Sequence, residues 1–352
     1  MTPKPTESSG AVRSGPGAGP ARRRRWGWLL WAASPVVLWL ALRGIPLAEV
    51  GKVLARLGAG QAILIVLINV GVIVVLASRW WMILRAQGHR ISIVKVSGYR
   101  LAAFAINYFS PGTHVGGEPL QVYLLAKRHG IPARQGAASV LLDRSLDFTA
   151  NSLFTVIGLA VLIGLGLLQG FSGPGFLIVS LVLLALPIAY LVLVGRGVHP
   201  LSSVVESFAR RWTRLAPGAR FLREAEETVG EFCRDSPRAL AFGLALSGLS
   251  WLVLILEYSV MLRFLGLSLD LAGTVAALTA GRLALLVPLP GALGVLEGSQ
   301  VLALTALGHM PAEGAGLGLV IRARDLVFAG AGLLLGAWLT SGRGFLQRDK
   351  KP

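Results

Sequence analysis

The stretch SPGTHVGGEP at residues 110–119 has a counterpart later in the chain, LPGALGVLE at residues 289–297. Both copies contain Pro-Gly, and in both a glutamate follows the proline by seven residues, at Glu118 and Glu297. Each copy places helix-breaking residues and one carboxylate in an apolar segment, where irregular backbone persists only against protein or water. Two such breaks in corresponding places are typical of a membrane transporter's binding site.

The composition of the whole chain favours a polytopic membrane protein. Its 352 residues are 54% hydrophobic and only 14% charged, which leaves too few polar residues to cover a soluble globule of this size. The formal net charge of +17 raises nucleic-acid binding as an alternative. However, the basic residues flank apolar runs, and no RNA-binding aromatic motif accompanies them. Cys233 is the only cysteine, so an intrachain disulfide is excluded.

Apolar runs predict six spanning helices, at residues 26–42, 61–78, 137–168, 175–194, 239–262 and 316–340. Residues 1–21 are predicted to be a disordered tail, residues 22–342 a transmembrane domain, and residues 343–352 a basic C-terminal tail. Residues 195–238 form a predicted cytoplasmic linker. Its apolar residues recur at helical spacing opposite arginines, which fits either an amphipathic helix on the membrane surface or a solvated helix packed on its neighbours.

Two further apolar segments are too short to cross a bilayer, which requires about 20 residues. Residues 96–109 precede the first break, and another short run, at 120–126, follows it. Residues 271–287 and 295–307 flank the second break in the same way. The sequence therefore predicts an all-α fold with two re-entrant helical hairpins in addition to the six spans.

The basic residues predict how these elements are oriented. Exterior loops hold only four of the 34 Lys and Arg residues, namely Arg43, Lys52, Arg56 and Arg263. Four more lie in membrane segments and the rest fall in cytoplasmic segments, as the positive-inside rule expects. Both termini are then cytoplasmic, and the two hairpins open from opposite sides. Repeat one, about 96–168, and repeat two, about 271–340, would form an inverted repeat.

Charged residues within the membrane segments are the candidate substrate-binding residues. They are Glu118, Glu297, Arg144, Arg282, Arg322, Asp143, Asp147 and Asp325. The half-helix breaks are predicted at Pro111, Gly112, Gly116, Gly117, Pro290, Gly291 and Gly294. Free N–H groups at the start of each half-helix favour an anion such as a lipid phosphate, whose oxygens match the planar donors of arginine.

Structural alternatives exist for several of these charges. Glu118 and Glu297 could simply cap their half-helices and neutralise an arginine. The charges of Asp143, Arg144 and Asp147 could stay at the membrane interface. Glu257 is predicted to pair with a nearby arginine. No HExxH, GxSxG or P-loop pattern occurs, so no metal, cofactor or enzymatic activity is expected.

The chain resembles the lysylphosphatidylglycerol synthase transmembrane-region family of flippase-like integral membrane proteins over roughly residues 25–342. The residues that carry the resemblance are Asn107, Pro111, Gly116, Gly117, Glu118, Ser139, Val140, Asp143, Arg144, Asp147, Pro288, Pro290, Gly291, Gly294, Glu297 and Arg322. Two positions depart from the family pattern, since Gln121 stands in place of an arginine and Ala292 in place of a second glycine. These departures leave the lipid headgroup open.

This resemblance implies a domain of a bacterial or archaeal cell membrane that moves phospholipids, or headgroup-modified phospholipids, between leaflets. The chain has no room for the soluble synthase domain of the longer members, so synthase activity is not expected. We therefore expect a lipid translocase that acts through a polar groove between the two hairpins, with anionic or modified phospholipids and no nucleic acid as partners. The alternatives are a non-transporting membrane partner of a separate transferase, and a small-solute transporter.

Overall fold

The computed structural model describes residues 35–110, 116–168 and 173–341, whose regular secondary structure is helical throughout. A helical segment at 35–42 comes first. The elements that follow are α2 (Leu47–Leu54), α3 (Ala59–Ala86), α4 (Ile93–Phe109), α5 (Glu118–His129), α6 (Ala133–Gly164), α7 (Pro174–Gly195), α8 (Pro200–Ala209), η1 (Thr213–Leu215), α9 (Ala216–Asp235), α10 (Pro237–Phe264), α11 (Leu271–Ala284), η2 (Pro290–Ala292), α12 (Val295–Ala306) and α13 (Pro311–Thr340). The prediction of an all-α membrane protein is confirmed.

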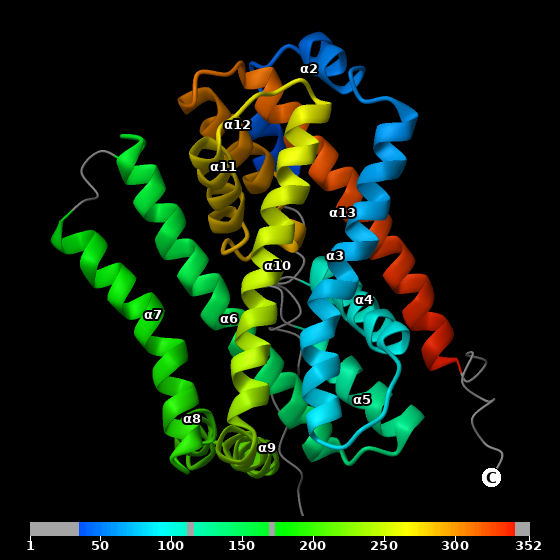
Figure 1. Ribbon diagram of the computed structural model, residues 1–352, viewed down its shortest axis with the longest axis vertical. Coiled ribbons are helices and arrows are strands. Elements are labelled where there is room, and N and C mark those ends of the chain that lie inside the picture. Colours follow the sequence, from blue (N-terminus) through cyan, green and yellow to red (C-terminus); the bar gives the residue numbers. More distant parts are fainter. Residues whose placement is uncertain (1–34, 111–115, 169–172, 342–352) are drawn as a thin grey trace, which may run out of the picture.

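Four described helices are long and apolar enough to cross a membrane, namely α3, α6, α7 and α10. They run along the long axis of the molecule (Figure 1). Leu177, Leu181 and Leu186 on α7 are each more than 60% exposed, a surface that suits hydrocarbon and not water. These helices coincide with four of the six predicted spans, 61–78, 137–168, 175–194 and 239–262.

The remaining two predicted spans are the first and the last. The span at 26–42 begins outside the described residues, and its last part, 35–42, is helical. The span at 316–340 lies within α13, which begins earlier, at Pro311, and is 30 residues long. α13 packs against α4 and against α12, and so joins the two hairpins.

The helices on either side of each break form hairpins at opposite ends of the molecule (Figure 1). α4 and α5 enclose the first break, and α11 and α12 enclose the second. A side chain caps the first arm of each: Ser92 Oγ accepts the Lys95 N–H at 3.4 Å, and Asp270 Oδ1 accepts the Gly273 N–H at 2.7 Å. These caps supply acceptors for backbone N–H groups at the helix start, and hydrocarbon contains no such acceptors. Each hairpin reaches only part of the way along the bundle.

The structure corrects the predicted end of the second span. A span that ends at residue 78 would leave Arg79, Trp80 and Trp81 at the membrane interface, but α3 continues past them to Ala86. Arg79 is 1% exposed and Trp80 is fully buried. The expectation fails for Arg79 because acidic side chains on α6 neutralise it inside the bundle.

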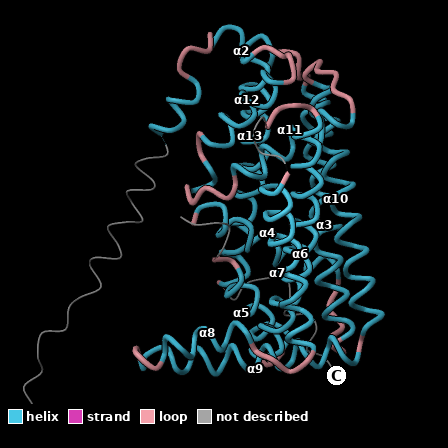
Figure 2. The backbone as a smooth tube through the Cα atoms, turned by 90° about the vertical axis from the view of Figure 1, so that its left-hand side faces the viewer, coloured by secondary structure: helices cyan, strands magenta, loops and turns pink. Residues whose placement is uncertain are grey.

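The predicted linker folds into the paired helices α8 and α9, which lie across one end of the bundle and project beyond it (Figure 2). Ala225, Val229 and Phe232 bury the inner part of α9 against α3, α6 and α7. The buried Glu226 holds α8 in place, because its carboxylate accepts the N–H groups of Leu201 and Ser202 at 3.0 and 2.9 Å. Two backbone donors at the start of α8 are thereby satisfied.

Candidate functional site

The second break is closed by its own glutamate. Gly294 has φ +81°, which favours glycine, and its N–H donates to Glu297 Oε2 at 2.8 Å. The same carboxylate accepts Nε and Nη2 of Arg322 on α13 at 2.8 and 3.1 Å. This fork-to-fork pair is buried, with side-chain exposures of 1% for Glu297 and 8% for Arg322. A bidentate geometry of this kind fixes both partners.

Arg322 also connects the second break to the first hairpin. Its Nη1 donates to the Gly291 carbonyl at 2.5 Å and to the hydroxyl of Tyr108 at 2.8 Å. Tyr108 is the penultimate residue of α4, immediately before the first break, and Gly291 and Pro290 lie in the second. Side chains and backbone from both hairpins therefore meet at one guanidinium, although the two breaks are far apart in the sequence.

The first break also pairs its glutamate with an arginine, but through a single contact. Glu118 Oε2 accepts the Gly116 N–H at 2.8 Å, and Glu118 Oε1 lies 2.8 Å from Nη2 of Arg144 on α6. The Gly117 N–H donates to Asn107 Oδ1 at 2.6 Å. A Cβ on Gly117 would lie 2.3 Å from a backbone oxygen of α4, so only glycine allows α4 and α5 to approach this closely. Two predicted break residues, Pro111 and Gly112, lie outside the described residues.

The contacts of the two glutamates correct one expectation. The N–H groups of Gly116 and Gly294 are not free for a lipid phosphate, because the carboxylates of Glu118 and Glu297 already accept them. Glu297 reaches back three residues to its N-cap Gly294, as in a capping box, and Glu118 reaches back two residues to Gly116. The geometry agrees with the structural alternative for both residues, in which they cap the half-helix and neutralise an arginine.

A second ionic cluster surrounds Asp143. Its two carboxylate oxygens accept Nε of Arg79 at 2.7 Å and Nη1 of Arg100 at 2.8 Å. Arg79 also donates to Asp147 at 3.0 Å and to Ser247 of α10 at 2.9 Å. Asp143 is 3% exposed, so its carboxylate is enclosed by the bundle. α6 begins at Ala133, well before this residue.

Sequence reasoning did not identify Arg79 as part of this cluster. The available signal was the apolar sequence WWMIL at 80–84, which continues the helical pattern beyond Arg79. A single arginine between two apolar runs lies inside a helix and needs a partner there.

A third cluster lies on α13 and α10. Arg324 pairs with Glu257 and, at 2.7 Å, with its neighbour Asp325. Asn69 of α3 also donates to Glu257, at 2.8 Å. Glu257 therefore has the arginine partner that the sequence predicts. Asp325 faces Arg324 and is 19% exposed at its side chain.

Arg282 differs from the other buried arginines. Its guanidinium lies 4.9 Å from the ring centroid of Trp251 on α10, and within the described part of the chain it forms no ion pair or hydrogen bond. It is only partly buried, and it interacts electrostatically with Arg324, which repels it, and with Asp147, Glu257 and Asp325, which attract it. This partly accessible cation therefore lies among charges of both repeats without a contacting carboxylate. A guanidinium in this state has donors available for an anion.

The described residues contain no group of three or more His, Cys, Asp or Glu side chains that could hold a metal ion. The chemistry of the site therefore rests on arginines, carboxylates and backbone groups in this part of the chain. Such a site can hold and orient charged groups.

Comparison with known proteins places these features in a family. Residues 28–332 match the family model described as the lysylphosphatidylglycerol synthase TM region. A UPF0104 membrane protein of Methanothermobacter thermautotrophicus is 24% identical over 288 residues, which cover 78% of this chain and 83% of that protein. A UPF0104 membrane protein of Methanocaldococcus jannaschii is 29% identical over 140 residues, 40% of each chain.

Proposed function

This chain belongs to the family of the lysylphosphatidylglycerol synthase TM region, and from that membership we propose that it moves a phospholipid or headgroup-modified lipid between membrane leaflets. The family name refers to the membrane region of an enzyme that makes a modified phospholipid. A multi-pass protein of this kind contacts lipid around its spanning helices. The proposal assigns the chain to a bacterial or archaeal cell membrane with both termini in the cytoplasm, as its basic residues predict.

One observation carries the proposal: Arg282 makes no ion pair among the described residues although it lies within the membrane region. An isolated charge in such a place is costly and is a functional hypothesis by default. A lipid phosphate would supply the missing counter-charge, and the guanidinium matches two of its oxygens. The neighbouring Asp147 and Asp325 would then face any cationic group carried by the same headgroup.

The two hairpins supply a route for movement. They lie at opposite ends of the bundle (Figure 1) and meet at Arg322, which contacts Tyr108 of one and Gly291 of the other. Arg282 lies in the last turn of α11, just before the second break, and a headgroup held there would lie between two units that can each open toward one leaflet. Rocking of one repeat against the other is a general mechanism of alternating access.

The test uses the purified chain in liposomes with a fluorescent phosphatidylglycerol, whose outer-leaflet fraction is destroyed by dithionite. We expect Arg282→Ala to slow exchange between leaflets by about 10-fold or more, since a charged hydrogen bond contributes about 1.5–3 kcal/mol. Arg282→Lys should retain part of the rate because the charge remains. Lys52→Ala is the matched control, because Lys52 pairs with Glu49 on the exposed α2.

Three results would contradict the proposal. Wild-type protein that exchanges lipid no faster than empty liposomes would favour the non-transporting membrane partner of a separate transferase. Equal rates for the wild type and Arg282→Ala would remove Arg282 from the site. Uptake of a soluble substrate, without dependence on acyl chains, would instead indicate the small-solute transporter.

A further inference from the structure

We propose that the α8–α9 pair docks on the anionic headgroup surface of the membrane that the bundle spans. The outer part of the pair contains exposed apolar side chains and arginines that form no ion pair in the described chain. Short connections to α7 and α10 hold the pair at one end of the bundle. The proposal does not depend on lipid translocation, because it concerns a surface remote from the charged clusters of the two repeats.

Charge is the first argument. The segment 210–223, RRWTRLAPGARFLR, contains five arginines and no acidic residue. Arg223 lies near Glu206 and Glu227, at 3.4 and 3.5 Å. The other four make no ion pair with any residue of the described chain, and they are Arg210, Arg211, Arg214 and Arg220. A basic surface of this kind is attracted to anionic lipid.

The second argument is an apolar stripe on the same pair of helices. Leu201, Val204 and Phe208 follow helical spacing on α8 and are 41%, 56% and 60% exposed. Trp212 extends the stripe at 60% exposure. Ser202 and Ala209, about 100° around the helix from this stripe, are buried against the protein. An exposed apolar stripe beside arginines is typical of a helix that lies in the membrane interface.

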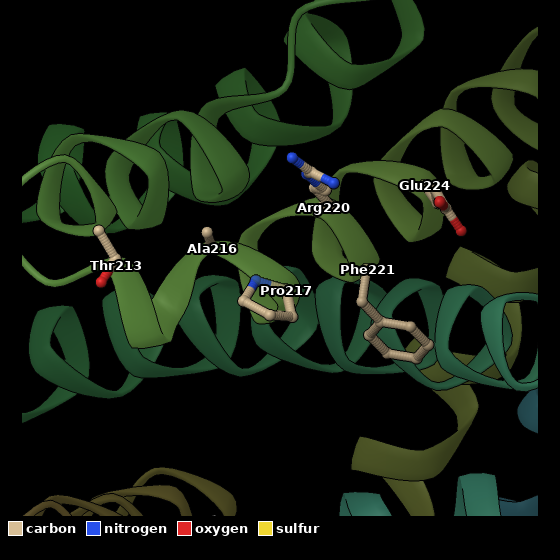
Figure 3. Close-up of a pocket in the computed structure, with 6 residues that line it drawn as sticks. All are labelled: Thr213, Ala216, Pro217, Arg220, Phe221 and Glu224. Carbon is tan, nitrogen blue, oxygen red and sulfur yellow. The ribbon is translucent and has the colours of Figure 1, made fainter. Parts of the chain in front are cut away.

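A depression of about 450 Å³ lies beside this stripe, at the start of α9 (Figure 3). Pro217 and Phe221 give it an apolar lining, and Arg220 and Glu224 add charged groups. Long arginine side chains can lay their stems on such a lining and hold the charge at the headgroups.

Position is the third argument, and it selects the membrane over a protein partner. α7 ends at Gly195 and α8 begins at Pro200, whereas α9 ends at Asp235 and α10 begins at Pro237. Because α7 and α10 are both candidate membrane spans, these short connections hold the pair where the spans leave the hydrocarbon. The pair also runs across the long axis of the bundle (Figure 2), which is the orientation of a helix that lies along a surface crossed by the spans.

The test is a depth measurement on the full chain in lipid nanodiscs. In a Cys233→Ser background, one nitroxide is attached at Phe208→Cys and, as a matched control, at Ser203→Cys. Position 203 is exposed and lies about 140° around the helix from position 208. With phosphatidylglycerol present, we expect the label at 208 to collide mainly with oxygen, and the label at 203 with a water-soluble nickel chelate. Equal access of the chelate to both labels would overturn the proposal and leave the surface to a protein partner.

A charge variant tests the electrostatic part separately. The charge variant replaces four arginines by Gln, at Arg210, Arg211, Arg214 and Arg220. We expect the ratio of molecules with a docked α8–α9 pair to molecules with an undocked pair to fall at least 10-fold, since each arginine near an anionic surface contributes about fivefold to binding. Nanodiscs made of neutral phosphatidylcholine should weaken docking of the chain that keeps all four arginines by a similar factor. If the label at 208 stays equally deep in both cases, the claim of anionic selectivity is wrong. The leaflet-exchange rate is recorded in parallel, so that a loss of docking is distinguished from a loss of transport.

Discussion

The buried pair of Arg322 and Glu297 allows a quantitative test of the junction between the hairpins. Among the described residues, Arg322 supplies the only guanidinium that contacts Glu297, whose side chain is 1% exposed, and Arg322→Met removes it. The remaining contact of this carboxylate is the Gly294 N–H. Breaking a buried ion pair by removing one partner costs about 3–5 kcal/mol. We expect Arg322→Met to lose about that much unfolding free energy.

A double-mutant cycle separates the charge from the packing. Glu297→Gln keeps an acceptor for the Gly294 N–H but leaves Arg322 with only carbonyl and hydroxyl partners, at a cost of about 2 kcal/mol. The double variant contains neither charge, and we expect it to be at least about 2 kcal/mol more stable than the sum of the single effects predicts. Arg56→Met is the matched control. Its pair with Glu313 has a 3.5 Å separation, and Arg56 is 42% exposed at its side chain, so less than about 1 kcal/mol should be lost.

Unfolding can be followed in mixed micelles through Cys233, the only cysteine of the chain. The thiol is partly covered in α9, and burial raises the pKa of Cys233 above its usual value. A maleimide dye therefore reacts slowly with the folded protein and faster once the thiol is exposed. The reasoning would be refuted if Arg322→Met cost no more than Arg56→Met, or if the double variant were as unstable as the two single effects combined.

Three further predictions follow from other parts of the molecule. Gly117→Ala should lose about 1–3 kcal/mol of stability, because the new Cβ would overlap the α4 backbone. Gly164→Ala should be nearly neutral in the same assay, because a Cβ at that position has no neighbour within 4 Å. Equal losses for the two variants would contradict the close approach of α4 and α5. Asp143→Asn leaves two buried arginines short of negative charge and should cost about 3–5 kcal/mol, so unchanged denaturation by detergent would exclude it as their partner. Maleimide labelling of folded Cys233 should reach half its maximal rate at a higher pH than a free cysteine does, because its pKa is raised; a lower midpoint would be inconsistent with this burial.

The breaks and the kinds of residue around them could be predicted from the sequence. Pro-Gly followed by a glutamate predicts an interrupted helix with its own carboxylate near the start. Glu118 and Glu297 do sit there, and both contact a glycine N–H and an arginine. The capping role was considered only as an alternative, because sequence spacing does not show whether a carboxylate turns back to its own helix or faces a ligand.

The choice of partners could not be predicted. Asp143 pairs with Arg79 and Arg100, which lie 64 and 43 residues away along the chain, and the match depends on how three helices pack. Arg79 was instead counted among interfacial charges, because a charge near the end of an apolar run has the same local pattern whether it faces lipid headgroups or a buried aspartate. Only the tertiary arrangement distinguishes the two.

Both breaks contain a glutamate–arginine pair, but the two pairs differ in geometry and in burial. Glu297 and Arg322 form a bidentate pair, whereas Glu118 and Arg144 meet through one oxygen and one nitrogen. The side chains of Glu297 and Arg322 are 1% and 8% exposed, whereas those of Glu118 and Arg144 are 21% and 34% exposed. Under the proposed function, this asymmetry corresponds to one of two states, in which the second pair is tight and buried and the first is looser and more accessible. The opposite state would keep both ion pairs and exchange their tightness and burial between the units, which is the property that makes opposed repeats suited to alternating access.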